Sequence, residues 1–477
     1  MTHGLHATSP QRPLPDQGYR LGFGPESLWY LDKLTPHSPV YNVPFLSRLC
    51  GTLDVVAFEK ALNALVERQS VLRNVFMASG GAPLALPLKK RKVSLNQVDL
   101  RHLPQPEREV EARRLACQEA AARFDLARDL MLRTFLYRLA DQEFLFLFVT
   151  HHIVFELGSL AILYRDLSAF YNAFVMGKPP ELPPLTFQDR DFAVWQRNQL
   201  QGERLKRLNM YWEQQLKDAP TIELPLDFPR PRAHTHRGVR HFFDMPPELC
   251  ARTISFCREL GTTPYRGLLA AFYICLHCYS GQTDFSVGSP FASRCPGIEN
   301  TIGFFANTLV MRADLPGDYT YRELIKKVDR MALRVIANSE LSFEKVVEAV
   351  QPPRDPSRTP LFQVSFRGRT QPYASLQLQG LVTHQPEFID NGTAKFDLAL
   401  EVEITTGKAC FIEYCTDLFR EQTIIQMEED YQNLLSDLIT YRDSRLHELQ
   451  APIAIRERHR RRVGQDASSC TSKEVAQ

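Results

Sequence analysis

The chain of 477 residues has almost no excess of charge, because 57 lysines and arginines stand against 55 aspartates and glutamates. The net charge of +2 gives no reason to expect a nucleic-acid partner, which usually goes with a strong basic excess. No apolar run reaches the roughly 20 residues of a membrane-spanning helix, and the first 20 residues hold no apolar core of a secretory signal. We therefore expect a cytoplasmic chain with neither a membrane nor a nucleic acid as partner.

Organised cysteine chemistry is also scarce. Ten cysteines are present, but they contain only one CxxC, Cys275-Leu276-His277-Cys278, and no second pair completes a metal site. This CxxC lies in an apolar stretch, 267–279, that has the character of a buried helix. A place in the hydrophobic core is therefore favoured over a zinc or redox site.

Patterns of apolar residues predict mixed helices and strands in two comparable halves, an α/β or α+β architecture. The Pro-rich segment 177–189 (GKPPELPPLTFQD) separates the halves as a linker. We thus predict a flexible segment over 1–18, lobes over 19–176 and 190–448, and a disordered tail over 449–477. Helices are expected over 25–34, 55–73, 159–174 (with Ser159 as N-cap), 191–216, 246–261, 264–279 and 420–441. Strands are expected at 132–139 and 144–150, which form a hairpin, and at 284–288, 307–312, 361–366 and 409–414.

The segment 144–159, FLFLFVTHHIVFELGS, carries the most chemical information. An apolar strand ends in His151 and His152, and a short apolar run, Glu156 and the start of a helix follow. Adjacent side chains of a strand point to opposite faces, so one histidine faces a cavity while the other faces the core. A histidine at a strand end is suited to orient a nucleophile or to accept its proton near neutral pH. Two hydrogen-bonded structural histidines are the alternative.

This segment resembles the HHxxxDG motif of the condensation domains of nonribosomal peptide synthetases. Six further segments resemble the other core motifs of that family in the same order, and the resemblance covers about residues 21 to 446. They are 21–31 with YNVP at 41–44, 68–76 (RQSVLRNVF), 191–197 (DFAVWQR), 302–312 (IGFFANTLVMR), the weaker 338–344 (NSELSFE) and 354–361 (RDPSRTPL).

The resemblance implies two chloramphenicol-acetyltransferase-like lobes, arranged as a V-shaped pseudo-dimer around a central tunnel. It implies an acyltransferase that moves an acyl group from a carrier-protein thioester to an amine or a hydroxyl, forming an amide or an ester. The expected partners are an acyl or peptidyl carrier protein as donor and a small-molecule or carrier-bound acceptor. The phosphopantetheine arm belongs to the carrier and is a substrate, so we expect no bound cofactor and no metal. Two basic runs, 89–92 and 456–462, are either solvated segments or contacts for an acidic carrier.

The resemblance also assigns roles to individual residues. His152 takes the place of the catalytic second histidine, and His151 that of its structural neighbour. Glu156 stands where the family has an aspartate that pairs with an arginine of the other lobe. Arg294, in the segment GSPFASR, is the candidate for that arginine, and an ion pair at the surface is the alternative.

Asn307 and Ser365 are candidates for the wall of the tunnel. For Asn307, a buried amide that satisfies backbone groups is an equal alternative.

This sequence departs from the family pattern at several positions. Glu156-Leu157 replaces the family's Asp-Gly, and Leu157 adds bulk beside the reaction centre and disfavours positive φ. Gly158 follows one position later and could restore flexibility. Ser27 stands where the first motif usually has arginine, and Asp189 where the fourth often has tyrosine.

Other functions remain open. A condensation-like module that recruits partners without catalysis is one, and an epimerisation domain or a coenzyme A-dependent acyltransferase of the same fold are others. A heterocyclisation domain carries two aspartates in place of the histidines, which disfavours that function here. Both a free-standing enzyme and an excised domain agree with the sequence.

Overall fold

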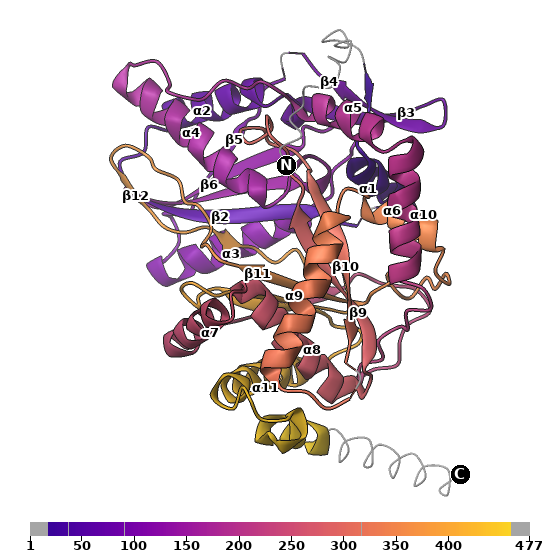
Figure 1. The fold of residues 1–477 in the computed structure, drawn as a ribbon. Helices are drawn as coiled ribbons and strands as arrows, with labels where there is room; N and C mark the ends of the chain where they lie inside the picture. The colour runs from indigo at the N-terminus through magenta and orange to yellow at the C-terminus, as the bar shows by residue number, and fades with distance from the viewer. Residues whose placement is uncertain (1–17, 37, 90, 316, 459–477) are drawn as a thin grey trace, which may run out of the picture.

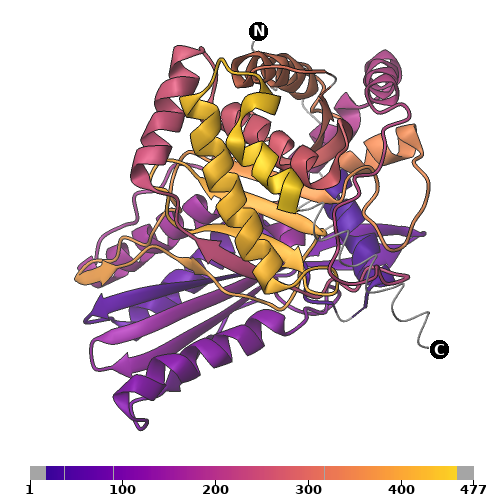
Figure 2. The same cartoon turned by 90° about the horizontal axis from the view of Figure 1, so that it is seen from below.

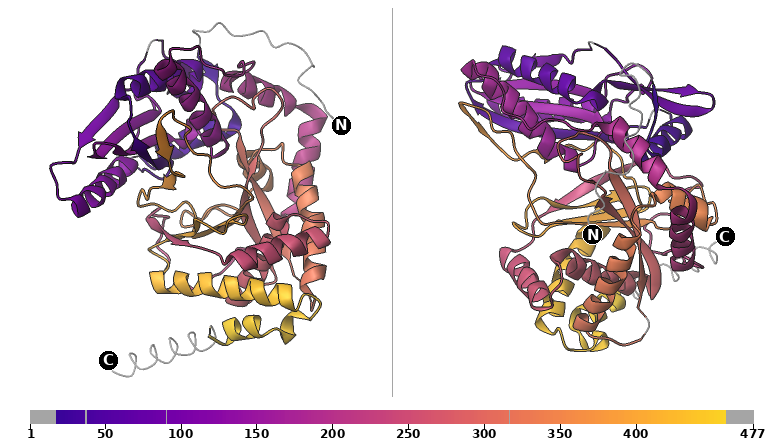
Figure 3. Two further views of the ribbon diagram at one scale, coloured as in Figure 1. Left: turned by 90° about the vertical axis from the view of Figure 1, so that its left-hand side faces the viewer. Right: turned by 45° about the horizontal axis from the view of Figure 1, so that its top comes forward.

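The computed structural model describes residues 18–36, 38–89, 91–315 and 317–458. It consists of two lobes, each built on an open sheet with helices packed against it (Figures 1 and 3). The predicted mixed α/β architecture is confirmed. The predicted flexible segment, except for residue 18, and the end of the predicted tail lie outside the described residues.

The sheet of the N-terminal lobe has strand β7 at its centre, in the order β12-β2-β7-β6-β5. Strands β6 and β7 are antiparallel neighbours and confirm the predicted hairpin. The register between β2 and β7 places Asn42 opposite His151 at the end of the strand pair. The strands are β2 (Asn42–Gly51), β5 (Leu95–Asp99), β6 (Leu132–Ala140), β7 (Glu143–His151), β12 (Leu381–Thr383) and β13 (Glu387–Phe388), which also pairs with β2.

Strand β7 is apolar on both faces because helices cover both. On one face, Phe58 of α2 packs edge-on against Phe146, and Tyr164 of α4 packs against Phe148. On the other face lies α3, which contacts β2, β6 and β7. These helices are α2 (Val55–Arg68), α3 (Gln105–Ala121) and α4 (Gly158–Met176).

The sheet of the C-terminal lobe has the order β10-β9-β11-β14-β15-β8. Strand β11 runs parallel to both of its neighbours, and the other pairs are antiparallel. The strands are β8 (Gly238–Phe243), β9 (Asp284–Ala292), β10 (Ala306–Asp314), β11 (Val364–Arg369), β14 (Leu398–Glu403) and β15 (Cys410–Cys415). A third, small sheet joins β1 (Tyr19–Arg20), β4 (Ala82–Pro87) and β3 (Asn74–Ser79).

Helices of the C-terminal lobe pack around α8, which is buried along most of its length and carries both cysteines of the CxxC in the core, as predicted. Figure 2 shows α11 lying across this lobe, seen from below. The remaining helices are α1 (Phe23–Leu34), α5 (Asp189–Gln199), α6 (Gly202–Gln215), α7 (Pro247–Glu259), α8 (Pro264–Ser280), α9 (Tyr321–Ala337), α10 (Phe343–Val350) and α11 (Glu421–Thr440). Short 3-10 turns occur at Ser70–Arg73, His152–Val154 and Leu446–Glu448.

The two lobes are not separate along the chain. Strands β12 and β13 belong to the C-terminal half, yet both pair with β2 of the N-terminal sheet. Ile302, Leu376 and Ile389 likewise lie in the hydrophobic core of the N-terminal lobe. The C-terminal half therefore reaches across and completes the first lobe.

Three predicted boundaries are wrong. The helix expected over 191–216 is two helices, separated by Leu200 and Gln201, and Gly202 begins the second with a φ of +57°. The helix expected over 55–73 ends at Arg68 and continues only as a 3-10 turn. Residues 450–458 are helical, with Ile455 buried against the C-terminal core, where the sequence predicts a disordered tail.

Candidate active site

The site forms where β7 ends. His151 is the last residue of the strand, and His152 opens a single 3-10 turn that leads to Glu156 and α4. The backbone N–H of His152 donates to the carbonyl of Tyr41 at 2.8 Å, which fixes the turn to the segment before β2. A central strand with both faces packed therefore holds the two histidines in place.

His151 faces the core. It is buried, its Nδ1 accepts a hydrogen bond from the backbone N–H of Ile153 at 3.1 Å, and its ring packs edge-on against Tyr41 and Phe124. Burial lowers the pKa of His151 to about 3. His151 is therefore a neutral side chain that braces the turn.

His152 faces a cavity. Its Nδ1 donates to the backbone carbonyl of Phe155, because a carbonyl can only accept. The proton thus sits on Nδ1, and Nε2 keeps a free lone pair. Burial and, next, the charge of Lys395 hold the pKa of His152 well below its ordinary value, so the ring is neutral at neutral pH.

The cavity beside His152 has a volume of about 180 Å³ and lies between the lobes. Leu157, Val40 and the first two residues of β2 line it from the N-terminal lobe, and Ser365 on β11 lines it from the C-terminal lobe. Charged side chains of the C-terminal lobe complete its wall: Arg240, Arg367, Lys395, Glu401 and Glu413.

Most of these charges are paired with each other. Glu401 accepts from Arg367 at 2.8 Å and from Arg369 at 2.6 Å, and Glu413 pairs with Arg240 at 2.5 Å. The ammonium group of Lys395 has no ion pair among the described residues and lies 5.6 Å from the ring of Tyr41. Burial lowers the pKa of Lys395 to about 8. No sequence pattern pointed to these residues, since they come from strands and loops more than 80 residues beyond His152 in the chain.

Glu156 and Arg294 meet across the lobes. Arg294 Nε lies 2.8 Å from Glu156 Oε1, and the two side chains are only 17% and 4% exposed, so the pair is not a surface ion pair. Burial raises the pKa of Glu156, and the guanidinium offsets part of that rise. Arg294 also donates to the carbonyls of Ile298 and Thr301 and to the hydroxyl of Ser159.

Ser159 is not the helix cap that the sequence predicts. Leu157 occupies the N-cap position of α4, and the Ser159 hydroxyl instead donates to the carbonyl of Gly303 at 3.0 Å. It also accepts from the backbone N–H of Gly303 and from Arg294. The serine is thus a second link between the lobes beside the ion pair.

Leu157 and Gly158 adopt helical geometry. Leu157 has φ −61° and ψ −32°, so replacement of the family's glycine costs no positive-φ strain here. Its side chain borders both the cavity and the core of the N-terminal lobe. A Cβ on Gly158 would lie 3.1 Å from both Arg294 Nε and Glu156 Oε1. Gly158 therefore admits the ion pair by lacking a side chain, not by supplying the flexibility that the sequence suggests.

Asn307 does not line the cavity of His152. Its side chain donates to the carbonyls of Ser339 and Leu341 and accepts from the backbone N–H groups of Thr308 and Phe343. These bonds occupy the whole amide, so Asn307 braces the loop before α10, and its place in a tunnel wall stays a prediction. It borders a second cavity of about 310 Å³.

Phe304 lies between the two cavities. Its ring packs edge-on against His152, with ring centroids 4.9 Å apart, and it lines the second cavity. The side chain of Thr308 borders both cavities. The two cavities are thus neighbours at Thr308, and a continuous tunnel through them stays a prediction.

The part of the chain that the structure describes contains neither a cluster of metal-binding side chains nor a helix that could span a membrane. No group of three or more His, Cys, Asp or Glu side chains there is arranged to hold a metal ion. None of the helices in these residues is long and apolar enough to cross a bilayer. Of the basic run at the C-terminus, Arg456 donates to His277 and Arg458 pairs with Asp430, so both are engaged within the chain.

Comparison with known proteins identifies relatives along nearly the whole chain. Residues 19–454 match the family model described as a condensation domain. The chain is 41% identical to a linear gramicidin synthase protein of Brevibacillus parabrevis over 423 residues, which are 88% of this chain and 8% of that protein. It is 35% identical to phosphinothricin tripeptide synthetase PhsC of Streptomyces viridochromogenes over 474 residues, 95% of this chain and 43% of that protein. The chain thus spans less than half the length of these relatives.

Solved structures share the fold. The X-domain from teicoplanin biosynthesis superposes with a TM-score of 0.81 at 24% identity, covering 93% of this chain and 98% of that one. The first condensation domain of the CDA synthetase superposes with a TM-score of 0.79 at 19% identity, covering 91% and 99%. Two chloramphenicol-acetyltransferase-like lobes are therefore the architecture of this chain as well.

Proposed function

Because the chain belongs to the condensation-domain family of nonribosomal peptide synthetases, we propose that it transfers an acyl group from a carrier-protein thioester to an amine or a hydroxyl. The observation that carries this proposal is the placement of His152. Its neutral ring presents a free Nε2 at a cavity that both lobes line. An acyl acceptor bound there would find a hydrogen-bond acceptor already oriented by the Phe155 carbonyl.

His152 would accept the proton of the attacking nucleophile through Nε2 as the new C–N or C–O bond forms. The thioester C–S bond would then break, and the proton would pass to the leaving phosphopantetheine thiolate, which departs as the thiol. The low pKa of His152 keeps the imidazole neutral, so that Nε2 can accept a proton or a hydrogen bond. When the substrate is a neutral amine, orienting that amine is the larger part of the role of His152. A hydroxyl acceptor depends more on proton removal. Bringing donor and acceptor together in one cavity supplies much of the acceleration.

The remaining residues would position this histidine. His151 braces the turn that carries His152, and the Glu156–Arg294 pair holds the start of α4 against the C-terminal lobe. Ser365 and Leu157 would border the bound substrate. The phosphopantetheine arm would arrive with the carrier, as a substrate of the reaction.

Intact-mass analysis tests this proposal. An acylated carrier protein is mixed with the chain and with free amines, alcohols or an aminoacylated carrier, and transfer is followed by loss of the acyl mass. His152→Ala is expected to lower turnover about a hundredfold or more, the scale of a lost general base. The matched control is His102→Ala, because His102 is exposed and outside the cavity.

Three outcomes would contradict parts of this proposal. Wild-type-like turnover by a folded His152→Ala protein removes the role of His152. No transfer to any acceptor by the wild type favours a module that only recruits partners. Exchange of the substrate α-proton in deuterated water, without bond formation, indicates epimerisation instead.

A further inference from the structure

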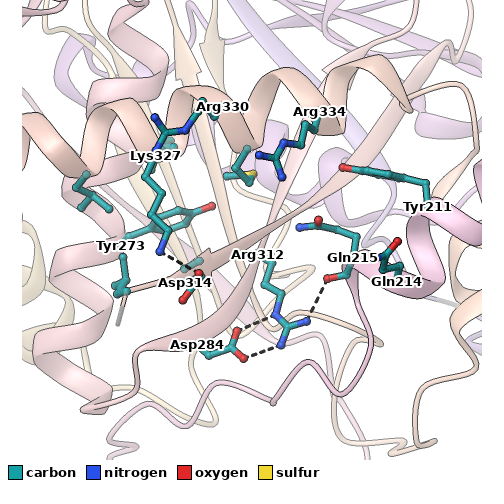
Figure 4. A pocket seen from close by; sticks show the side chains of 15 residues that line it. Tyr211, Gln214, Gln215, Tyr273, Asp284, Arg312, Asp314, Lys327, Arg330 and Arg334 are labelled. Atoms are coloured by element: carbon teal, nitrogen blue, oxygen red, sulfur yellow. Dashed lines mark hydrogen bonds and ion pairs between the residues drawn. The ribbon is translucent and has the colours of Figure 1, made fainter. Parts of the chain in front are cut away.

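A third and larger cavity lies in the C-terminal lobe, away from His152. It has a volume of about 650 Å³ and is bordered by α9, β10 and the end of α6 (Figure 4). None of its lining residues borders the cavity of His152. Nothing in the proposed acyl transfer requires it.

The lining is rich in positive charge. Arg312 binds Asp284 through two contacts of 2.6 and 2.8 Å, and Lys327 pairs with Asp314 at 2.9 Å. Asp284 and Asp314 are the two acidic residues of the lining, so both are already neutralised. Arg330 and Arg334 remain as an excess of two positive charges.

Arg330 and Arg334 lie one turn apart on α9 and line the cavity. Among the described residues, neither guanidinium takes part in an ion pair or a hydrogen bond. Two like charges at this spacing repel each other and destabilise a helix slightly. An anion bound between them would be attracted to both guanidinium groups and would offset this repulsion.

Tyr211 supplies an independent observation. Its hydroxyl is buried and has no hydrogen-bond partner among the described residues. Figure 4 shows that hydroxyl directed toward the side chain of Arg334. Burial raises the pKa of Tyr211 to about 12, so the hydroxyl remains a neutral donor. The hydroxyl is therefore available to donate to a ligand in the cavity.

We propose that this cavity binds a small molecule that bears a phosphate group. Arg330 and Arg334 hold the phosphate from α9, and the Tyr211 hydroxyl donates to one of its oxygens. A tetrahedral phosphate offers enough oxygens for two guanidiniums and a hydroxyl at once, whereas one guanidinium already occupies both oxygens of a carboxylate. The apolar side chains of Leu324 and Met331 on the same wall contact the organic part of the ligand.

Titration calorimetry with sodium pyrophosphate as the probe tests this site at low ionic strength, where charge interactions are least screened. Binding to the wild-type chain is expected, with Arg330→Gln/Arg334→Gln weakening it about tenfold or more. Tyr211→Phe is expected to weaken it about threefold or more, the scale of one lost hydrogen bond. Both arginines are exposed, so the double variant keeps the fold, which its unfolding temperature verifies.

The charge-matched control is Lys60→Gln/Arg354→Gln. It removes two exposed cations outside the cavity and is expected to leave the affinity unchanged. The proposal is overturned if the wild type does not bind pyrophosphate, or if both double variants bind it equally well. Citrate that binds more tightly than pyrophosphate would overturn the assignment to phosphate. None of these outcomes depends on acyl transfer, so the site and the proposed function stand or fall separately.

Discussion

Arg294 Nε lies 2.8 Å from Glu156 Oε1, and this ion pair joins the loop after the two histidines to the loop after β9 of the other lobe. Because both side chains are mostly buried, removing one leaves the other as an uncompensated charge. Glu156→Ala and Arg294→Ala are each expected to lower the free energy of unfolding by about 3–5 kcal/mol. Arg294→Ala should cost more, since the guanidinium also donates to the carbonyls of Ile298 and Thr301.

Urea denaturation of both single variants and the double variant measures the coupling. We expect the double variant to lose less than the sum, by about 1 kcal/mol or more. Glu203→Ala/Lys206→Ala is the control, because that pair on α6 is 88% and 72% exposed and should contribute little. Strictly additive losses would mean that the two side chains do not interact.

Gly158 gives a second test of the same pair. A methyl group there would lie 3.1 Å from both charged atoms, so Gly158→Ala should separate them and lower the unfolding temperature. Alanine is otherwise favoured over glycine in a helix by about 1 kcal/mol. In the Arg294→Ala background the same change should therefore be neutral or stabilising. A loss of stability in both backgrounds would place the strain elsewhere.

The local parts of the site were predictable, and the parts that depend on the second lobe were predictable only through resemblance. The apolar run before His151 predicts the strand, and the alternation of side chains predicts that one histidine faces the core and the other a cavity. The partner of Glu156 lies 138 residues further along the chain, and only the segment GSPFASR pointed to Arg294.

Other contacts left no local signal. Strands β12 and β13 are three and two residues long, too short for an alternating pattern, yet they extend the N-terminal sheet. Ser159 has the sequence features of a helix cap, but a contact with Gly303 of the other lobe takes its hydroxyl. Lys395 of the C-terminal half borders the same cavity as His152 because the two lobes pack together, and no residue spacing in the sequence predicts that contact.

The charge of Lys395 should help to set the pH below which the imidazole of His152 becomes protonated. Burial first, and then the charges of Lys395 and Arg367, lower the pKa of His152, while the hydrogen bond to the Phe155 carbonyl raises it. Lys395→Met removes the largest of these repulsions, so the pKa of His152 should rise. Lys395 has a pKa of about 8 and loses its charge above that pH, so its effect on His152 is present only below about pH 8.

Histidine-selective NMR titration measures this shift without any substrate. The His152 resonance should begin to titrate at higher pH in Lys395→Met than in the wild type. The acid limb of the kcat/KM profile should move in the same direction. Arg354→Met, which removes an exposed cation outside the cavity, should change neither. An unchanged His152 titration in Lys395→Met would show that the ammonium group does not act on the imidazole.

The side chain of Leu157 should limit the size of the acyl acceptor that fits beside His152. Its side chain borders the cavity of about 180 Å³ where the family has a glycine, so it narrows the space beside the imidazole. Leu157→Gly enlarges that space and is expected to widen the range of accepted amines and alcohols, with rates that saturate with free, small acceptors. It should also lower stability, because Leu157 packs on the core of the N-terminal lobe and glycine leaves that space unfilled.

The acceptor profile of Leu157→Gly is read as relative kcat/KM over a series of acceptors, so a general loss of activity does not mimic the effect. Leu157→Met is the matched control, because it keeps the side-chain volume and should keep the profile. If Leu157→Gly leaves the profile unchanged, then Leu157 does not limit acceptor size. If product forms only with carrier-tethered acceptors, the expectation that free, small acceptors are used is wrong.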